Sequence, residues 1–264
     1  TRVPLLVIEG EAGIGKSVLL RHLAAEAGAL GRPVFAGAAD AVERHTNFFA
    51  WREPFRALFG LDATLAPAAA RDRIAEALRP LDGRAERLPL LEPVLGVGFK
   101  DNETTAAMAG ADRGVATREL LADAFALLAG DTPVVLLDDL HWFDSASLAL
   151  IEAIRARAPR ALVAVGTRPT SDDTPPALAA LIADADSVRI PLVEMGEQEV
   201  RGMICRALAV ETIPDALGQY LATRGEGHPL FTIELALLLR EMGVIRIEGR
   251  QCAFDPDDAR LGAL

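Results

Sequence analysis

Near the start of the chain, the octapeptide Gly10–Ser17 combines three glycines with a lysine and a serine in the order Gly-Glu-Ala-Gly-Ile-Gly-Lys-Ser. An apolar run, Pro4–Glu9, precedes it, and apolar residues at helical spacing follow over Val18–Ala27. A glycine-rich turn between a strand and a helix lets successive backbone N–H groups face phosphate oxygens at the positive end of the helix. The pattern therefore predicts a P-loop that binds a nucleoside triphosphate.

The side chains of this P-loop have distinct predicted roles. Lys16 is expected to reach the β- and γ-phosphates, and the Ser17 hydroxyl is expected to ligate Mg²⁺. The predicted cofactors are therefore ATP or ADP together with Mg²⁺. The residues of this segment predicted to bind the nucleotide are Gly10, Glu11, Ala12, Gly13, Ile14, Gly15, Lys16, Ser17 and Val18.

A second candidate set follows an apolar run, Val134–Leu137, which has the composition of a strand buried on both faces. Asp138 and Asp139 come directly after it, where a parallel strand delivers ligand-binding residues. We assign Asp138 to Mg²⁺ and Asp139 to the orientation of the attacking water. The alternative is a turn with two solvated acids. Because Asp139 is shorter than glutamate by one methylene, slow hydrolysis is expected.

Another buried strand, Ala161–Thr167, ends in polar residues. If it neighbours the strand that carries Asp138, Thr167 and Arg168 lie near the γ-phosphate. Arg168 then stabilises negative charge on the transferring group and reports whether that group is present. The alternative is a surface arginine that follows a strand.

Two further turns carry weaker signals. Pro229 opens a helix after a glycine turn, and it is predicted to contribute to nucleotide binding by closing over the adenine ring; simple helix initiation is the alternative. Trp142 and Phe143 follow the two acids, and we interpret them as packing residues rather than as a platform for the base. Asp144 is expected to cap the helix that follows.

Strands and helices alternate over the first half of the sequence, which predicts an α/β fold with a parallel sheet flanked by helices. The stretch 81–112 reads as a loop-rich insertion. After Pro191 the pattern changes to short helices, and two alternating runs around Gly249 predict a β-hairpin. The expected strands are Leu5–Glu9, Pro33–Ala36, Val134–Asp138, Ala161–Thr167 and Val188–Pro191, and the expected helices include Phe48–Leu58, Ala68–Leu78, Val115–Ala129, Glu197–Leu208, Pro214–Thr223 and Pro229–Met242.

Composition narrows the classes of partner. The net charge is −11 without any Lys/Arg-rich run, so direct binding of nucleic acid by this segment is not expected. Without a long apolar stretch or an apolar leader, we expect no membrane association and a cytoplasmic location. Cys205 and Cys252 lack metal-ligand spacing and are expected to be buried, reduced thiols. A start at Thr1 and an abrupt end at Leu264 suggest a piece of a longer polypeptide.

Taken together, these motifs resemble the signal transduction ATPases with numerous domains (STAND), in particular the module found with class III adenylyl cyclases and large LuxR-type regulators. The resemblance implies an AAA+-like P-loop ATPase core at 1–192, a helical lid at 193–243 and, at 244–264, a hairpin that starts a winged-helix-like module. It also implies that Lys16, Ser17, Asp138, Asp139 and Arg168 match the phosphate, metal, water-orienting and sensor positions, and Pro229 the lid contact. The matching segments are Gly10–Ser17, Leu136–Asp144, Gly166–Pro169 and Gly227–Phe231.

Such a module implies an ATP-binding, slowly hydrolysing regulatory switch. Its expected partners are effector and sensor domains of the same polypeptide, such as helical repeats, a cyclase or a DNA-binding domain, with self-association in the ATP state. A second hypothesis is a nucleotide-dependent interaction module without significant turnover. A third, a small-molecule kinase, is weaker because no acceptor site is recognisable in the sequence.

Overall fold

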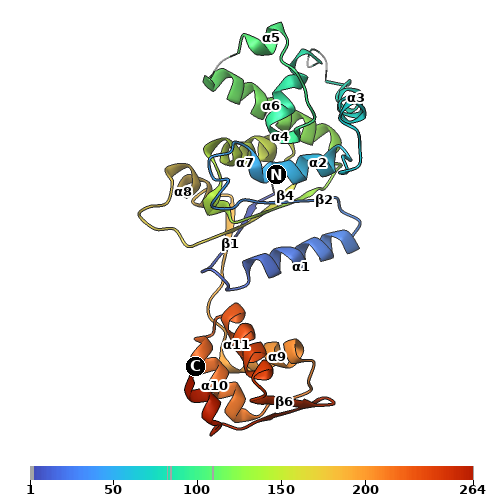
Figure 1. The fold of residues 1–264 in the computed structure, drawn as a ribbon. Helices are drawn as coiled ribbons and strands as arrows, with labels where there is room; N and C mark the ends of the chain where they lie inside the picture. Colours follow the sequence, from blue (N-terminus) through green and yellow to red (C-terminus); the bar gives the residue numbers. More distant parts are fainter. Residues whose placement is uncertain (1–2, 82, 84, 109, 264) are drawn as a thin grey trace. The chain divides into compact units, whose positions relative to one another are not determined.

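The computed structural model of the chain describes residues 3–81, 83, 85–108 and 110–263 (Figure 1). It divides into two compact units. The first comprises Thr1–Glu9 and Ser17–Ile190, and the second comprises Gly10–Lys16 and Pro191–Leu264. The P-loop residues thus group with the C-terminal segment, while the strand before them and the helix after them belong to the first unit. The expected boundaries at residues 192 and 243 remain predictions.

The first unit contains the predicted parallel sheet. Its strand order is β2-β3-β4-β1-β5. The strand that leads into the P-loop, β1, therefore lies between β4, which precedes Arg168, and β5, after which the chain leaves the sheet. Glu9 pairs with Thr167 in the register of β1 and β4, and Asp138 pairs with Ala38 in that of β3 and β2. The strands are β1 (Leu5–Glu9), β2 (Val34–Ala38), β3 (Val134–Asp138), β4 (Leu162–Thr167) and β5 (Ser187–Pro191).

Helices cover both faces of this sheet, as Figure 1 shows: α1 (Lys16–Ala29) lies on one face, and α2 (Arg52–Leu58), α6 (Gly110–Leu128) and α7 (Ser145–Arg157) lie on the other. Alternate side chains of the strands pack toward each layer. On the face of α2 and α6, the rings of Phe35 and Phe125 meet edge to face with centroids 5.3 Å apart. The fold therefore presents the carboxyl ends of β1, β3 and β4 at one edge of a sheet that has helices on both faces.

The stretch 81–112 differs from the loop-rich insertion expected from its sequence. It contains a 3₁₀ helix, Ala85–Leu91, and two short helices, α4 (Glu92–Leu95) and α5 (Glu103–Ala106). Leu90 and Leu91 are fully buried in the main hydrophobic core. Pro89 and Pro93 interrupt the helical pattern that would reveal these turns, because proline lacks the backbone donor that a helix interior requires. Residues 82, 84 and 109 lie outside the described part.

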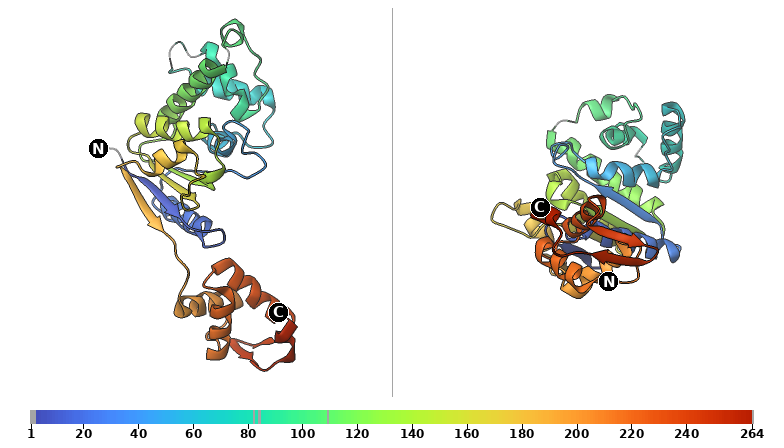
Figure 2. Two further views of the ribbon diagram at one scale, coloured as in Figure 1. Left: turned by 90° about the vertical axis from the view of Figure 1, so that its left-hand side faces the viewer. Right: turned by 60° about the horizontal axis from the view of Figure 1, so that its bottom comes forward.

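The described part of the second unit contains three α-helices, a 3₁₀ helix (Ala259–Ala263) and the predicted hairpin. The helices are α9 (Glu197–Leu208), α10 (Asp215–Gly225) and α11 (Pro229–Glu241), and the antiparallel strands are β6 (Ile245–Glu248) and β7 (Gln251–Phe254), shown in red in Figure 2. Cys205 and Cys252 are free but only half-buried, so they are less buried than expected. Among the described residues, no helix has the length and apolar character that crossing a membrane requires.

Gly37 allows the α2 region to pack directly on β2. A Cβ added at Gly37 would lie 2.0 Å from the carbonyl oxygen of Ala50 and 3.0 Å from Cγ of Pro54. Both groups belong to a tightly packed layer that cannot retreat, so we expect Gly37→Ala to lower the free energy of unfolding by about 3 kcal/mol. Urea unfolding followed by circular dichroism measures this loss.

Gly28 provides the matched control for this substitution. It lies in α1, and nothing is within 4 Å of an added Cβ there. Gly28→Ala is expected to stabilise the chain by about 0.5–1 kcal/mol, because alanine is the better helix former. Equal unfolding midpoints for Gly37→Ala and the natural sequence would contradict the close packing of Ala50 on β2.

Candidate functional site

The P-loop connects β1 to α1 and has the backbone that its glycines permit. Gly13 and Gly15 have φ angles of 79° and 113°, in the region that favours glycine. Helix α1 begins at Lys16, so the loop ends at a helix N-terminus, where the first N–H groups have no acceptor within the helix. This arrangement fits a bound polyphosphate, because backbone donors and the helix dipole both attract anions.

The Lys16 side chain is held over this loop. Its exposed fraction is 6%, and its Nζ donates hydrogen bonds to the carbonyl oxygens of Gly10, at 2.8 Å, and Glu11, at 2.9 Å. A largely buried ammonium group thus lies above the start of the phosphate cradle. This position suits the predicted contact of Lys16 with the β- and γ-phosphates.

Ser17 and Asp138 line one hollow in the first unit, with a volume of about 320 Å³. A hydroxyl and a carboxylate oxygen are hard ligands of the kind that Mg²⁺ prefers, so the pair fits the predicted metal site. The hollow extends along α1 and β2 toward the start of α2. Its other lining residues are Leu20, Arg21, Ala24, Ala36, Gly37, Ala38, Glu53 and Leu136.

Asp139 does not line this hollow among the described residues, although it directly follows Asp138. Its backbone is left-handed, with φ 56° and ψ 45°, and its N–H donates to Oδ1 of Asp138 at 2.9 Å. Such a conformation is costly for a residue other than glycine and often marks a functional turn. The structure thus brings Ser17 and Asp138 together, whereas Asp139 is not among the residues that line their hollow.

The end of β4 carries Thr167 and Arg168 as expected. Thr167 is fully buried, and its hydroxyl has no hydrogen-bond partner in the described part of the chain. The Arg168 guanidinium lies over the ring of Trp142, with its Cζ 5.8 Å from the ring centroid, a cation–π geometry. The turn after the acids therefore supports Arg168, a role of Trp142 that the sequence pattern did not reveal.

Gly166 lies in a segment that carries the resemblance, but sequence reasoning missed the role of this glycine. A Cβ added there would lie 2.6 Å from Oδ1 of Asp138 and 3.3 Å from Cδ1 of Leu20. The absence of a side chain on β4 thus makes room for the carboxylate on β3. A glycine inside an apolar strand is the signal that could have indicated this, because it commonly marks a close approach.

Pro229 begins α11, the helix predicted to carry the nucleotide contact. The next residue, Leu230, donates its backbone N–H to the carbonyl oxygen of Gly13 at 3.3 Å. A Cβ added at Gly13 would lie 3.2 Å from Cβ of Leu230. Within the second unit, the first turn of α11 therefore packs on the P-loop through Leu230, and the role of Pro229 itself remains a prediction.

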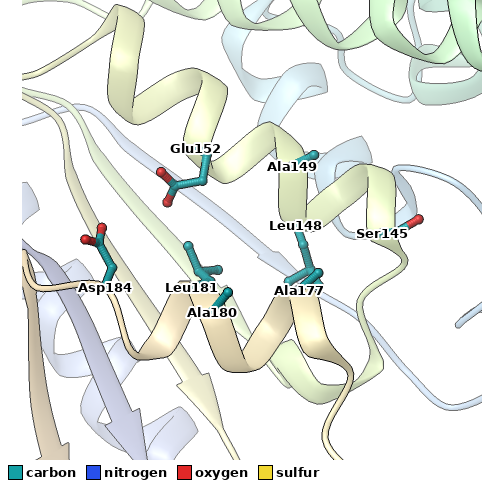
Figure 3. Close-up of a pocket in the computed structure, with 8 residues that line it drawn as sticks. All are labelled: Ser145, Leu148, Ala149, Glu152, Ala177, Ala180, Leu181 and Asp184. Carbon is teal, nitrogen blue, oxygen red and sulfur yellow. The ribbon is translucent and has the colours of Figure 1, made fainter.

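A larger hollow, of about 470 Å³, lies between α7 and α8 (Pro176–Ile182), and Figure 3 shows it with two carboxylates near one end. Both carboxylates, of Glu152 and Asp184, accept hydrogen bonds from Nη1 of the buried Arg155, at 2.7 and 3.1 Å. None of the predicted site residues lines this hollow. The lining residues are Ser145, Leu148, Ala149, Glu152, Ala177, Ala180, Leu181 and Asp184.

Solved structures with a similar arrangement share little sequence with this chain. One is a RuvB point mutant from Thermotoga maritima, with 15% identity and a TM-score of 0.44 over 90% of this chain and 56% of that chain. A second is a STAND protein with a tetratricopeptide repeat sensor from Pyrococcus horikoshii, with 16% identity and a TM-score of 0.40 over 86% of this chain and 26% of that chain. A third is the Orc1 protein of Aeropyrum pernix in complex with DNA, with 18% identity and a TM-score of 0.46 over 90% of this chain and 55% of that chain. The chain spans about half or less of the length of these proteins.

The sequence was also compared with curated proteins and with models of protein families. Curated proteins give no match to the sequence. Residues 196–253 match a domain of unknown function, and residues 1–165 match the AAA ATPase domain. The match to the AAA ATPase domain spans more than half of the chain and includes both the P-loop and Asp138. With this match, the expectation of an AAA-type P-loop ATPase module is confirmed, and the chain belongs to the AAA ATPase domain family.

Proposed function

We propose that this chain is the ATP-binding, slowly hydrolysing switch module of a larger signalling protein of the STAND type. The observation that carries the proposal is the common hollow lined by Ser17 and Asp138 at the end of the P-loop. A hydroxyl from the first turn of α1 and a carboxylate from the end of β3 are the two protein ligands that a P-loop ATPase uses for Mg²⁺. The family membership supports the same chemistry.

In this proposal each side chain acts on a different part of the nucleotide. Lys16 binds the β- and γ-phosphates, while Ser17 and Asp138 hold Mg²⁺, which neutralises charge on the phosphates when bound. Asp139 orients the attacking water, and Arg168, supported by Trp142, stabilises the negative charge that develops on the γ-phosphate. The role of Pro229 is to contact the base at the first turn of α11.

The position of Asp139 supports the proposed slow turnover. Its carboxylate is short, its backbone is left-handed, and it lies outside the hollow lined by Ser17 and Asp138. A water-orienting group contributes fully only when it is within hydrogen-bond reach of the reacting water. A module of this kind holds ATP long enough for other domains to respond to its presence.

The wider context of the switch rests on the motif resemblance. We propose effector and sensor domains in the same polypeptide, whether helical repeats, a cyclase or a DNA-binding domain, and self-association in the ATP state. The acidic net charge supports a segment that does not itself bind nucleic acid. A cytoplasmic location without membrane attachment completes the proposal.

A single-turnover assay with radiolabelled ATP and Mg²⁺ tests the proposal, because it separates bound nucleotide from released phosphate. We expect Asp139→Asn to bind ATP normally and to release phosphate about tenfold more slowly, less than the usual effect of a well-placed catalytic base. Asp131→Asn is the matched control, since Asp131 lies on the exposed surface and pairs with Arg160.

The outcomes distinguish the candidate functions. Failure of the natural sequence to bind ATP would refute the proposal altogether. Bound ATP that persists for hours without phosphate release would favour the second candidate, a nucleotide-dependent interaction module without significant turnover, which the position of Asp139 also favours. Transfer of the labelled phosphate to an added sugar or nucleoside would instead identify a small-molecule kinase.

A further inference from the structure

The residue that immediately precedes the P-loop is a buried acid. Glu9 is the last residue of β1, and only 6% of its surface is exposed. Arg189 on β5 binds its carboxylate in bidentate fashion, with Nε 2.9 Å from Oε2 and Nη2 2.8 Å from Oε1. Figure 2 shows the two strands side by side, in blue and orange. A planar, charge-assisted pair of this kind fixes both the distance and the orientation of its partners.

The next residue, Gly10, is fixed by the segment that follows β5. A Cβ added at Gly10 would lie 3.2 Å from Cβ of Leu192 and 3.3 Å from its carbonyl oxygen. It would also lie 2.5 Å from Cγ2 of Ile14, inside the loop itself. The residue before the P-loop is thus held by Arg189, and the first residue of the P-loop lies against Leu192, only three positions after Arg189 in the sequence.

The position of Gly10 matters for the phosphate cradle because its carbonyl oxygen accepts the hydrogen bond from Nζ of Lys16. A shift of the backbone at Glu9 would therefore move the point that holds this ammonium group. It would also move the first of the successive N–H groups that face the phosphates. Positioning errors of about 1 Å in such sites are expensive, since binding depends on several donors converging at once.

We propose that Arg189 is a positioning residue of the P-loop, acting through Glu9 to fix where the phosphate cradle begins. The inference rests on the proposed ATP binding. Arg189 does not contact the phosphates in this scheme; its bidentate ion pair determines the backbone position of Glu9 and Gly10. The pair also compensates for burial of the Glu9 carboxylate, which would be costly without a cationic partner.

A double-mutant cycle tests the proposal, with ATP affinity measured by equilibrium dialysis of radiolabelled ATP. We expect Arg189→Gln and Glu9→Gln each to raise the Kd for ATP about tenfold, and the double variant to be no weaker than either single one, because the two residues act through each other. Arg189→Lys keeps the charge without the bidentate geometry and should recover part of the affinity. Arg160→Gln, which removes an exposed ion pair with Asp131, is the control.

Two further readouts separate positioning from general stability. In steady-state hydrolysis, Arg189→Gln should raise KM with little change in kcat, because it weakens binding in the ground state and the transition state alike. In hydrogen exchange with ATP present, amides 10–17 should exchange faster in this variant than in Arg160→Gln. If a single variant unfolds, the double glutamine variant remains informative, since it leaves no buried unpaired charge.

The possible results are distinct. If the natural sequence binds no ATP, the proposed function fails, and with it the basis of this inference. If the natural sequence binds ATP but Arg189→Gln and the double variant have the Kd of Arg160→Gln, the positioning role is overturned while the proposed function stands. Additive losses in the double variant would also overturn it, because the residues would then act independently.

Discussion

We expect the Lys16→Ala variant to bind ATP at least about a hundredfold more weakly than the natural sequence, because it loses a charge-assisted contact to the phosphates. The ammonium group of Lys16 is almost fully buried above the loop, held by the carbonyl oxygens of Gly10 and Glu11. Alanine removes both this charge and its hydrogen bonds to the two carbonyl oxygens at the start of the loop. Equilibrium dialysis with radiolabelled ATP measures the change.

Lys100 gives the matched control, because it is exposed and is the only other lysine in the sequence. Lys100→Ala changes the net charge by the same amount as Lys16→Ala but lies outside the P-loop, so its affinity for ATP should equal that of the natural sequence. Equal losses of ATP affinity in the two variants would mean that ATP binding depends only on the overall charge of the protein. That result would remove the P-loop from the explanation of binding.

Much of the fold follows from periodicity along the chain. The apolar runs that become β1 and β3 have the predicted bounds, because a strand buried on both faces has few alternatives to a continuous apolar sequence. The short helices of 85–106 were not predicted. Pro89 and Pro93 break the helical pattern there, and burial of Leu90 and Leu91 depends on packing against distant elements rather than on local sequence.

Some residues of the candidate site could likewise be predicted from the sequence, and others could not. The P-loop and Asp138 are visible in the sequence because their chemistry depends on backbone turns a few residues long. The pair Glu9–Arg189 spans 180 positions, so only the sheet order, which places β1 beside β5, brings it together. The left-handed backbone of Asp139 has no local signature either, since such conformations are stabilised by the surrounding fold.

Two glycines of the sheet illustrate how the surrounding atoms decide the consequence of one substitution. At Gly37 an added methyl group would meet the backbone carbonyl oxygen of Ala50, which cannot move without shifting the turn that leads into α2. At Gly166 it would meet Oδ1 of Asp138, which is the far end of a side chain rather than backbone. The substitution at Gly37 therefore lowers the stability of the fold, whereas the substitution at Gly166 displaces one functional group.

For this reason we expect Gly166→Ala to leave the stability nearly unchanged and to reduce Mg²⁺-dependent ATP hydrolysis about a hundredfold, the cost of displacing a catalytic group by roughly 1 Å. The added Cβ would lie 2.6 Å from Oδ1 of Asp138, so the carboxylate must rotate away from the hollow that it shares with Ser17. Phosphate release measured over a series of Mg²⁺ concentrations should show a higher metal requirement, while ATP binding through Lys16 persists.

Gly28→Ala again serves as the control, because it adds the same methyl group in open space on α1 and should hydrolyse ATP at the natural rate. A cooperative unfolding transition for Gly166→Ala at the natural urea midpoint would show that only the site has changed. Natural hydrolysis and a natural Mg²⁺ requirement in Gly166→Ala would mean that Asp138 does not hold the metal. Because the atoms nearest to the added methyl group are those of the Asp138 carboxylate and Cδ1 of Leu20, such a result would separate the metal-binding role of Asp138 from its place at the end of β3.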